Sequence, residues 1–260
     1  MKELHRLIEI IAILRGPKGC PWDKAQDLSS MRPYLLEEVY EALDAMDQLE
    51  SDSANEMLEE ELGDLLFVVL LLCQIGVDEN RFQFEGVCRR IANKMVVRHP
   101  FVFGEDKGSQ TTAKGSLASW EQEKAKRNPK RSRLDGVPDN LPALLQTHRQ
   151  GEKAAAVGFD WQDSRGVFEK MTEELGELKE ALTTNSKKEI AHEYGDLLMA
   201  TANLGRHIDC PPEEALRLAN RRFKNRFKQM EEMSKANNDS MSNMTPESLE
   251  ALWERAKALT

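Results

Sequence analysis

The chain has 260 residues, of which 40% are hydrophobic and 31% are charged, and its 36 basic and 45 acidic residues give a formal net charge of −9. Typical domains hold roughly 100 to 200 residues, so this length predicts two domains. An aromatic content of only 6%, with 11 methionines, favours helices over sheets. The negative charge leaves no basic surface for a phosphate backbone, so we expect no nucleic-acid polymer among the partners.

The cysteines and the apolar runs exclude further classes of protein. Cys20, Cys73, Cys88 and Cys210 are widely separated and form no CxxC pair, which argues against a zinc site and a disulfide framework. The longest apolar run, 65–73, is much shorter than the roughly 20 residues of a membrane-spanning helix. The first residues mix acids and bases along an amphipathic stripe, unlike a signal peptide. We therefore expect a cytoplasmic protein that does not contact the membrane.

Apolar spacing predicts a series of helices in the first half of the chain. The first runs from about Leu4 to Leu14, where a cluster of glycines and prolines interrupts the pattern. A second begins near Pro33, a residue suited to the first helical turn, and is followed by helices over about 55–75 and 81–97. Residues 99–115 have the composition of a loop, and a short helix is expected over 116–127.

The second half repeats this organisation after a break. Residues 128–142 are rich in proline, glycine and charge, which is typical of a linker between domains 1–127 and 143–260. Helices are predicted over about 144–156, 165–182, 187–207 and 212–234, followed by a flexible polar stretch over 235–244. A last helix should begin with Thr245 as its N-cap and Pro246 in its first turn.

Several motifs recur between the halves at a nearly constant offset. Glu38 and Glu174 are 136 residues apart (174 − 38), and Asp64 and Asp196 are 132 apart (196 − 64). The segment Gly158-Phe159-Asp160-Trp161 resembles Gly19-Cys20-Pro21-Trp22, and Trp120 and Trp253 are 133 residues apart (253 − 120). The period is long enough for each copy to form its own small bundle, so we read a tandem duplication of one helical domain.

Each half carries two pairs of acids spaced three residues apart, which places both members of a pair on one helical face. The pairs are Glu38 with Glu41, Glu61 with Asp64, Glu174 with Glu177, and Glu193 with Asp196. Such pairs often lie on a solvated face. The stripe of Glu61 and Asp64, however, continues through Val68, so these acids should point inward. Converging carboxylates repel one another unless a cation lies between them, and all-oxygen ligands favour Mg²⁺, with Mn²⁺ as a possible substitute.

Basic and aromatic residues follow the acids in each half. Lys94 with Arg98, and Arg222 with Arg226, are spaced four residues apart, as expected either for a clamp on phosphate oxygens or for an ordinary solvated face. Each half then contains a Trp-x-x-x-Lys motif, formed by Trp120 with Lys124 and by Trp253 with Lys257. The tryptophans suit either base stacking or packing in a core.

This ordered set of motifs resembles the MazG family of nucleoside triphosphate pyrophosphohydrolases. The matching blocks are GCPWD, LLEEVYEALDA, EELGDLLF, RHPFVFG and SWEQEK in the first half, and VGFDW, EELGELKEA, EYGDLL, RRFKNRF and LWERAK in the second. The resemblance implies an all-α, bundle-like fold, a homodimer, and magnesium-dependent hydrolysis of a nucleoside triphosphate to monophosphate and pyrophosphate. Its biological purpose would be nucleotide-pool housekeeping or control of a stress nucleotide.

The resemblance also implies roles for individual residues in the second copy, which we expect to be the active one. The metal ligands would be Glu174, Glu177, Glu193 and Asp196, and the catalytic residues Glu173 and Glu174, with Glu173 a candidate acceptor of the water proton. The nucleotide would contact Lys170, Glu173, Arg222, Arg226, Trp253 and Lys257. Position 222 is Arg where the family commonly has Lys. The first copy retains its own acids, basic pair and Trp-x-x-x-Lys motif, so the sequence gives no reason to call it inactive.

Two other functions are compatible with the same residues. Glu189-Ile190-Ala191-His192 reads as the Glu-x-x-His motif of a di-iron carboxylate bundle, but the position matching His192 in the first half is Glu60. A non-catalytic module that binds a nucleotide or a protein partner is the second alternative. The sequence leaves open the preferred base and sugar and the number of metal ions.

Overall fold

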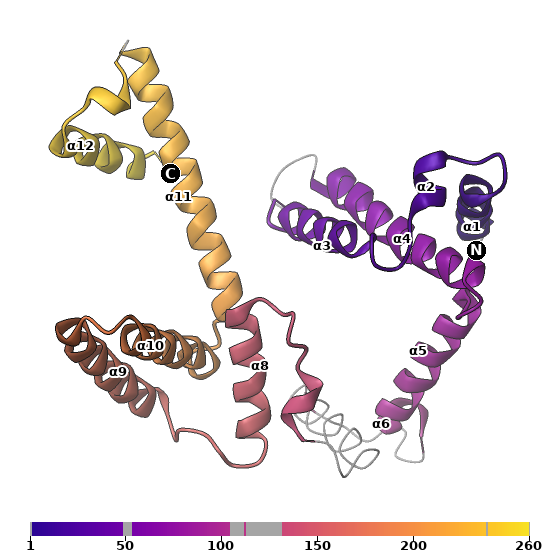
Figure 1. The fold of residues 1–260 in the computed structure, drawn as a ribbon, viewed down its shortest axis with the longest axis horizontal. Coiled ribbons are helices and arrows are strands. Elements are labelled where there is room, and N and C mark those ends of the chain that lie inside the picture. The colour runs from indigo at the N-terminus through magenta and orange to yellow at the C-terminus, as the bar shows by residue number, and fades with distance from the viewer. Residues whose placement is uncertain (1, 49–53, 105–111, 113–131, 238, 260) are drawn as a thin grey trace. The chain divides into compact units, whose positions relative to one another are not determined.

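The computed structural model describes residues 2–48, 54–104, 112, 132–237 and 239–259, and every regular element within these ranges is a helix (Figure 1). The expected all-α fold class is therefore confirmed. The chain divides into two compact units, Met1–Arg127 and Asn128–Thr260. Among the described residues, no helix is both long enough and apolar enough to cross a membrane.

The first unit is built on a pair of packed helices, α3 (Arg32–Met46) and α4 (Ala54–Asp78). Helix α1 (Lys2–Arg15) packs against α4, and the short α2 (Pro21–Ala25) follows it. The core contains Ile11, Met31 and Leu71. Helices α5 (Phe84–Arg98) and α6 (Pro100–Phe103) complete the described part of the unit. The acid-bearing α3 and α4 thus form its central layer.

Two short helices of this unit occupy segments expected to be irregular. Pro21 begins α2 because its fixed φ suits a first helical turn and its missing N–H is not needed there. Pro100 begins α6 for the same reason, inside the segment 99–115 expected to be a loop. The helix predicted over 116–127, with Trp120 and Lys124, lies outside the described residues.

The second unit is built on the pair α9 (Ser164–Thr184) and α10 (Lys187–His207), and α8 (Ala143–Ala155) packs against α10. Helix α12 (Pro246–Lys257) folds against α11 (Pro212–Ala236) around Met230, Leu252 and Ala256. Two single-turn 3₁₀ helices, η1 (Leu134–Gly136) and η2 (Met241–Asn243), precede α8 and α12. Thr245 caps α12 as predicted, because its side chain accepts a hydrogen bond from the backbone N–H of Ser248.

The connection between α9 and α10 fixes which acids face one another. Asn185 ends α9 in a left-handed conformation, with φ of 56°, and Ser186 caps α10 by accepting a hydrogen bond from the N–H of Glu189. Asparagine tolerates this conformation better than most residues. So tight a turn sets the two helices antiparallel, with Glu174 and Glu177 on one helix near Glu193 on the other.

In each unit an ion pair links the region where the first helix ends to the end of the acid-bearing pair, but the two ion pairs use different positions and have opposite polarity. In the first unit, Arg15 at the end of α1 pairs at 2.6 Å with Asp78 at the end of α4. Arg15 also donates to the carbonyl oxygens of Asp23 and Gln26. In the second unit, Asp160 in the loop after α8 pairs at 2.7 Å with Arg206 in the last turn of α10.

Candidate metal centre and nucleotide site

Three acids of the second unit lie close together across α9 and α10. Glu174, Glu177 and Glu193 each place a carboxylate oxygen within 4.8 Å of the others. Glu174 belongs to the buried stripe Val167, Glu174 and Ala181, which recurs every seven residues along α9. Its residue is only 4% exposed, and its Oε2 is buried without a hydrogen-bond partner. A buried carboxylate oxygen of this kind is costly unless a cation or a donor reaches it.

Lys170 lies one turn before the cluster on α9 and holds two neighbouring acids. Its Nζ donates to Glu173 at 2.6 Å and lies 2.7 Å from Oε1 of Glu174. Hydrogen bonds to Glu173 and then Glu174 raise the pKa of Lys170 above its ordinary value, so it stays charged. Lysine 170 thus supplies one positive charge at the edge of the cluster, and Glu173 faces solvent beside it.

The remaining acids of the cluster carry uncompensated negative charge. Burial, followed by the charges of Glu174 and Glu193, raises the pKa of Glu177. The donor set consists of carboxylate oxygens, which hard divalent cations such as Mg²⁺ and Mn²⁺ prefer. The orphaned Oε2 of Glu174 and the mutual distances of the three acids therefore fit a divalent cation among them.

Asp196, the fourth predicted ligand, contacts a residue that the sequence argument assigned to the helix surface. Nδ1 of His192 lies 3.1 Å from Asp196 and 3.5 Å from Glu193, and the three side chains form a second group of potential ligands that shares Glu193 with the first. His192 is exposed, as expected, but it borders the acidic cluster. The signal in the sequence was its spacing of four residues from Asp196, which places both side chains on one face of α10.

The first unit repeats the acidic cluster on α3 and α4. Glu38, Glu61 and Asp64 offer oxygens within 4.8 Å of one another. Burial, followed by the charges of neighbouring acids, raises the pKa of both Glu38 and Glu61, and Glu41 contributes to each shift. The position matching Lys170 in this unit is Tyr34 (170 − 136), so the two clusters differ in their neighbouring cation.

Of the predicted nucleotide residues on α11 and α12, Arg226 and Trp253 lie against each other. The guanidinium of Arg226 lies 5.8 Å from the ring centre of Trp253, and the ring of Phe223 lies 5.4 Å from it. Lys257 is exposed and pairs with Glu254 at 2.6 Å, and Arg222 is exposed on α11. Figure 1 shows α12 folded along the C-terminal part of α11, away from the α9–α10 pair. The structure thus forms two separate groups, one of the acids on α9 and α10 and one of Arg226 with Trp253 on α11 and α12.

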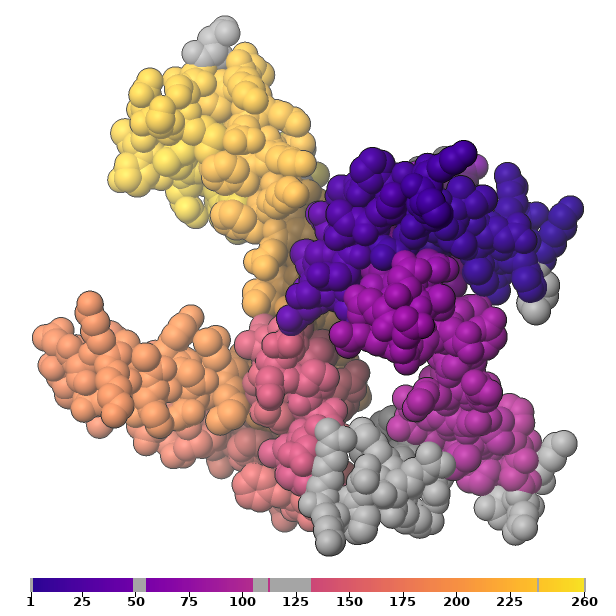
Figure 2. Space-filling view, turned by 45° about the vertical axis from the view of Figure 1, so that its right-hand side comes forward, coloured from indigo at the N-terminus to yellow at the C-terminus, as the bar shows by residue number. Residues whose placement is uncertain are grey.

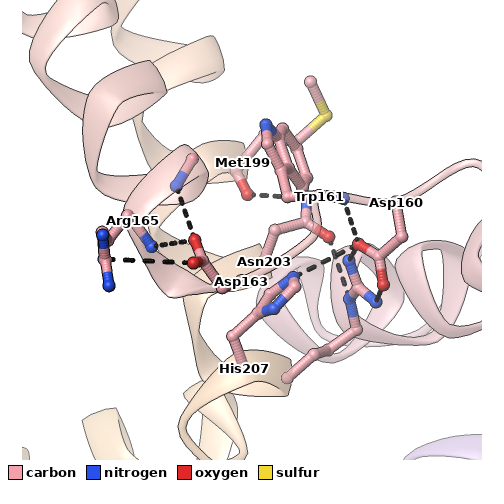
Figure 3. Close-up of polar contacts among 9 residues, drawn as sticks. Asp160, Trp161, Asp163, Arg165, Met199, Asn203 and His207 are labelled. Carbon is pink, nitrogen blue, oxygen red and sulfur yellow. Dashed lines mark hydrogen bonds and ion pairs between the residues drawn. The ribbon is translucent and has the colours of Figure 1, made fainter.

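A polar network at the far end of the α9–α10 pair was not anticipated (Figure 3). Asp160 accepts hydrogen bonds from both terminal nitrogens of Arg206, at 2.9 and 2.7 Å, and lies 3.2 Å from Nε2 of His207. The hydrogen bonds from Arg206 lower the pKa of Asp160. Asn203, also on α10, accepts from Nε of Arg206 at 3.2 Å. The bonds from Arg206 to Asp160 thus fix the loop before α9 to α10. The Gly-Phe-Asp-Trp motif marked this loop in the sequence but not its partners.

Comparison with known proteins relates both units to pyrophosphohydrolases. Residues 26–103 match the family model of the MazG nucleotide pyrophosphohydrolase domain, and residues 147–223 match that of phosphoribosyl-ATP pyrophosphohydrolase. The nucleoside triphosphate pyrophosphohydrolase/pyrophosphatase MazG of Thermotoga maritima is 41% identical over 97% of this chain and 95% of its own length.

The nucleoside triphosphate pyrophosphohydrolase of Escherichia coli K12 is 38% identical over 99% of this chain and 98% of its own length. The protein of the same name from Mycobacterium tuberculosis is 34% identical over 60% of this chain and 46% of its own. Since two of these relatives match along nearly their whole lengths, the chain belongs to the MazG family of nucleoside triphosphate pyrophosphohydrolases.

Proposed function

We propose that this protein hydrolyses nucleoside triphosphates to a nucleoside monophosphate and pyrophosphate, using a divalent cation held by the acids of α9 and α10. The observation that carries this proposal is the convergence of Glu174, Glu177 and Glu193 around a buried carboxylate oxygen that has no partner. Asp196 extends the ligand set because it forms, with His192 and Glu193, a second group of potential ligands that shares Glu193 with the first. When bound, Mg²⁺ or Mn²⁺ would neutralise the triphosphate oxygens and act as a Lewis acid at the scissile anhydride.

The other residues of the second unit bind and orient the substrate in this proposal. Lys170 turns from Glu173 and Glu174 toward a phosphate oxygen, because a phosphate carries more charge than one carboxylate. That movement frees Glu173, which is exposed beside the cluster, to accept a proton from the attacking water. Arg222, Arg226 and Lys257 lie on the separate α11–α12 pair, so in this proposal they stabilise the charge of phosphates bound at the acids of a second copy, and Trp253 holds Arg226 in place against its ring.

We place the main catalytic site in the second unit. The support is Lys170, which lies against the acidic cluster there, whereas Tyr34 occupies the matching position of the first unit. The first unit keeps three grouped acids, so it retains the means to hold a cation even without this lysine. Nucleotides are cytoplasmic metabolites, which agrees with the location expected from the sequence.

We further propose that the protein is a homodimer in which a second copy covers the central helix pairs. Both pairs expose apolar residues at helical spacing, namely Leu36, Val39 and Tyr40 on α3, Leu62, Leu66 and Val69 on α4, Phe168, Leu175 and Leu182 on α9, and Tyr194 and Leu198 on α10. In Figure 2 the α9–α10 pair (salmon to orange) projects to one side of α8 (rose). Exposed apolar stripes of this length mark an interaction surface, and two such pairs form a four-helix bundle.

The decisive experiment tests which reaction the protein catalyses and, separately, which unit catalyses it. Purified protein is incubated with each nucleoside triphosphate and Mg²⁺, and monophosphate, diphosphate, pyrophosphate and orthophosphate are quantified. We expect equimolar monophosphate and pyrophosphate, lost on chelation and in Glu174→Gln but retained in Glu38→Gln. Diphosphate with orthophosphate would contradict the α,β cleavage. Loss of activity in Glu38→Gln alone would move the site to the first unit.

A further inference from the structure

We propose that the ring of Trp161 stacks against the nucleobase of the substrate, at the end of the acid-bearing α9–α10 pair where α8 meets it. The inference rests on the proposed function, and it assigns to this loop the role that the sequence motif gave to Trp253. Three independent observations support it. They are the position of the ring along α9 and α10, its anchoring, and the repetition of the arrangement in the first unit.

The ring of Trp161 lies on the same edge of α9 as the acids. Gly166, Lys170, Glu173 and Glu177 follow one another at spacings of three or four residues, so they share one face of the helix. A Cβ atom on Gly166 would lie 3.0 Å from Cδ1 of Trp161, so the indole rests directly on this glycine. From Gly166 to Glu174 is eight residues, or about 12 Å of helix. The ribose and base of a nucleotide extend from its α-phosphate over a comparable length.

The residues along α10 also connect the acidic cluster to Trp161. Asp196, Asn203 and His207 follow one another at spacings of seven and four residues, so they too lie on one face. The ring of Trp161 meets that of His207 edge to face, with centres 6.4 Å apart. Both helices therefore carry the acidic cluster near their middle and border Trp161 at the end away from their common turn. A triphosphate bound at the acids with its base directed along α9 and α10 would reach this ring.

The loop holds Trp161 rigidly and leaves part of it accessible. Its backbone N–H donates to Asp160 at 3.0 Å, and Asp160 is itself fixed by Arg206 and His207 (Figure 3). Two residues later, Asp163 caps α9 by accepting from the N–H groups of Arg165 and Gly166. Trp161 itself remains 36% exposed. A tryptophan anchored from both sides stacks on a base without first losing much conformational freedom.

The first unit repeats the arrangement with different neighbours. Trp22, the counterpart of Trp161, is 47% exposed and packs edge to face against Tyr34 at 5.3 Å. Tyr34 occupies the position of Lys170, one turn before Glu38. An exposed tryptophan thus stands at the same end of both acid-bearing helix pairs. Trp253, by contrast, already has Phe223 and the Arg226 guanidinium against its ring.

The test compares inhibitors with and without a base. The monophosphate product of the best substrate and ribose 5-phosphate are each titrated against pyrophosphate release. Because stacking of a base on an aromatic ring contributes about 1–3 kcal/mol, we expect the wild-type protein to prefer the nucleotide and Trp161→Ala to lose about tenfold of that preference. Inhibition by ribose 5-phosphate should stay unchanged, and Trp161→Phe should restore most of the preference.

Further variants separate stacking from structural support. Gly166→Ala shifts the indole slightly without removing it and should reduce the preference less than Trp161→Ala does, whereas a Cβ on Gly176 meets open space and that substitution should leave the preference unchanged. Equal weakening of both inhibitors by Trp161→Ala, or loss of the preference in Trp253→Ala instead, would overturn the proposal. If the wild type releases no pyrophosphate, the proposed function fails, and calorimetric titration with nucleoside triphosphate and inorganic tripolyphosphate then tests Trp161 by itself. In that assay, an equal loss of affinity for both ligands in Trp161→Ala would refute the stacking role.

Discussion

Lys170 Nζ lies 2.7 Å from one carboxylate oxygen of Glu174, while the other oxygen of that carboxylate is buried without a partner. The lysine therefore competes with any cation that Glu174 binds. We predict that Lys170→Gln strengthens Mn²⁺ binding in the absence of nucleotide, because a repelling charge is removed. It should lower kcat/KM at least tenfold, because the same lysine is needed to bind phosphate. Calorimetry and steady-state kinetics measure the two effects.

Lys179→Gln provides the control for this prediction, because Lys179 is an exposed lysine of the same helix. This variant loses the same charge and should change neither the Mn²⁺ affinity nor kcat/KM appreciably. Weaker Mn²⁺ binding in Lys170→Gln would show that the lysine supports the cluster and does not compete with the cation.

The acidic cluster of the first unit should make that unit less stable when no cation is present. Burial and neighbouring acids raise the pKa of Glu38, so its ionised form is disfavoured in the folded state. At neutral pH, in a chelator, Glu38→Gln should raise the melting temperature by about 2 °C. The additional stabilisation by Mg²⁺ should be smaller than in the wild type. Scanning calorimetry with Glu59→Gln as the matched change on α4 tests both effects, and a lower melting temperature in Glu38→Gln contradicts the argument.

The pair between Asp160 and Arg206 should make the stability of the second unit depend on pH. The hydrogen bonds from Arg206 lower the pKa of Asp160 in the folded state. Its contribution is therefore complete above the ordinary aspartate pKa and is lost as the pH falls toward the lowered value. We expect Asp160→Asn to reduce the free energy of unfolding at pH 7 by about 1–3 kcal/mol, and the difference from the wild type to shrink below about pH 4.

Denaturant titrations at the two pH values measure this effect. Asp163→Asn is the control in the same loop, because asparagine caps a helix about as well as aspartate does. A difference for Asp160→Asn that persists unchanged in acid would show that lost packing, and not the ion pair, causes the destabilisation.

The proposed dimer makes a prediction about mass. Leu175 lies midway along the exposed stripe Phe168, Leu175 and Leu182 on α9. Leu175→Glu should place a charge in the interface and reduce the mass in solution from twice the chain's 29.6 kDa to one copy. Light scattering after size-exclusion chromatography measures this. Leu134→Glu changes an equally exposed leucine of η1 and should leave the mass unchanged, whereas a monomeric wild type would refute the dimer.

Much of the fold was predictable because each helix carries its own local signals. The apolar spacing from Leu4 and the Thr245–Pro246 start located α1 and α12 closely. Of the four acids expected to converge in each half, three lie within reach of one another, although Asp64, which was expected to point inward, is exposed. The short helices α2 and α6 were missed since a single turn leaves no periodic pattern, and Pro21 and Pro100 were taken only as breaks. The boundaries of the predicted linker stay a prediction, although η1 and the buried Val137 lie within it.

The candidate site was less predictable wherever it depends on contacts between distant segments. The spacing of Asp160 and Arg206, 46 residues apart, carries no periodic signal, and only packing brings them together. The same holds for Trp253, whose neighbours Phe223 and Arg226 belong to another helix. His192 was recognisable as a surface residue, and its spacing of four residues from Asp196 signalled their contact, but only the packing of α9 on α10 shows that this face borders the acidic cluster.

The two ion pairs lie at different positions of the repeat, which helps each half of the duplication to pair with its own helices. During folding, α4 and α10 are similar enough to compete for the same partner segment. By the offset of 132 residues, Cys210 matches Asp78 and Gln74 matches Arg206, so an exchange of the two helices would leave both Arg15 and Asp160 without an ionised partner. Charges that lose their partners at these partly buried positions would disfavour both exchanges. Tandem copies with ion pairs at matching positions would lack this protection against mispairing.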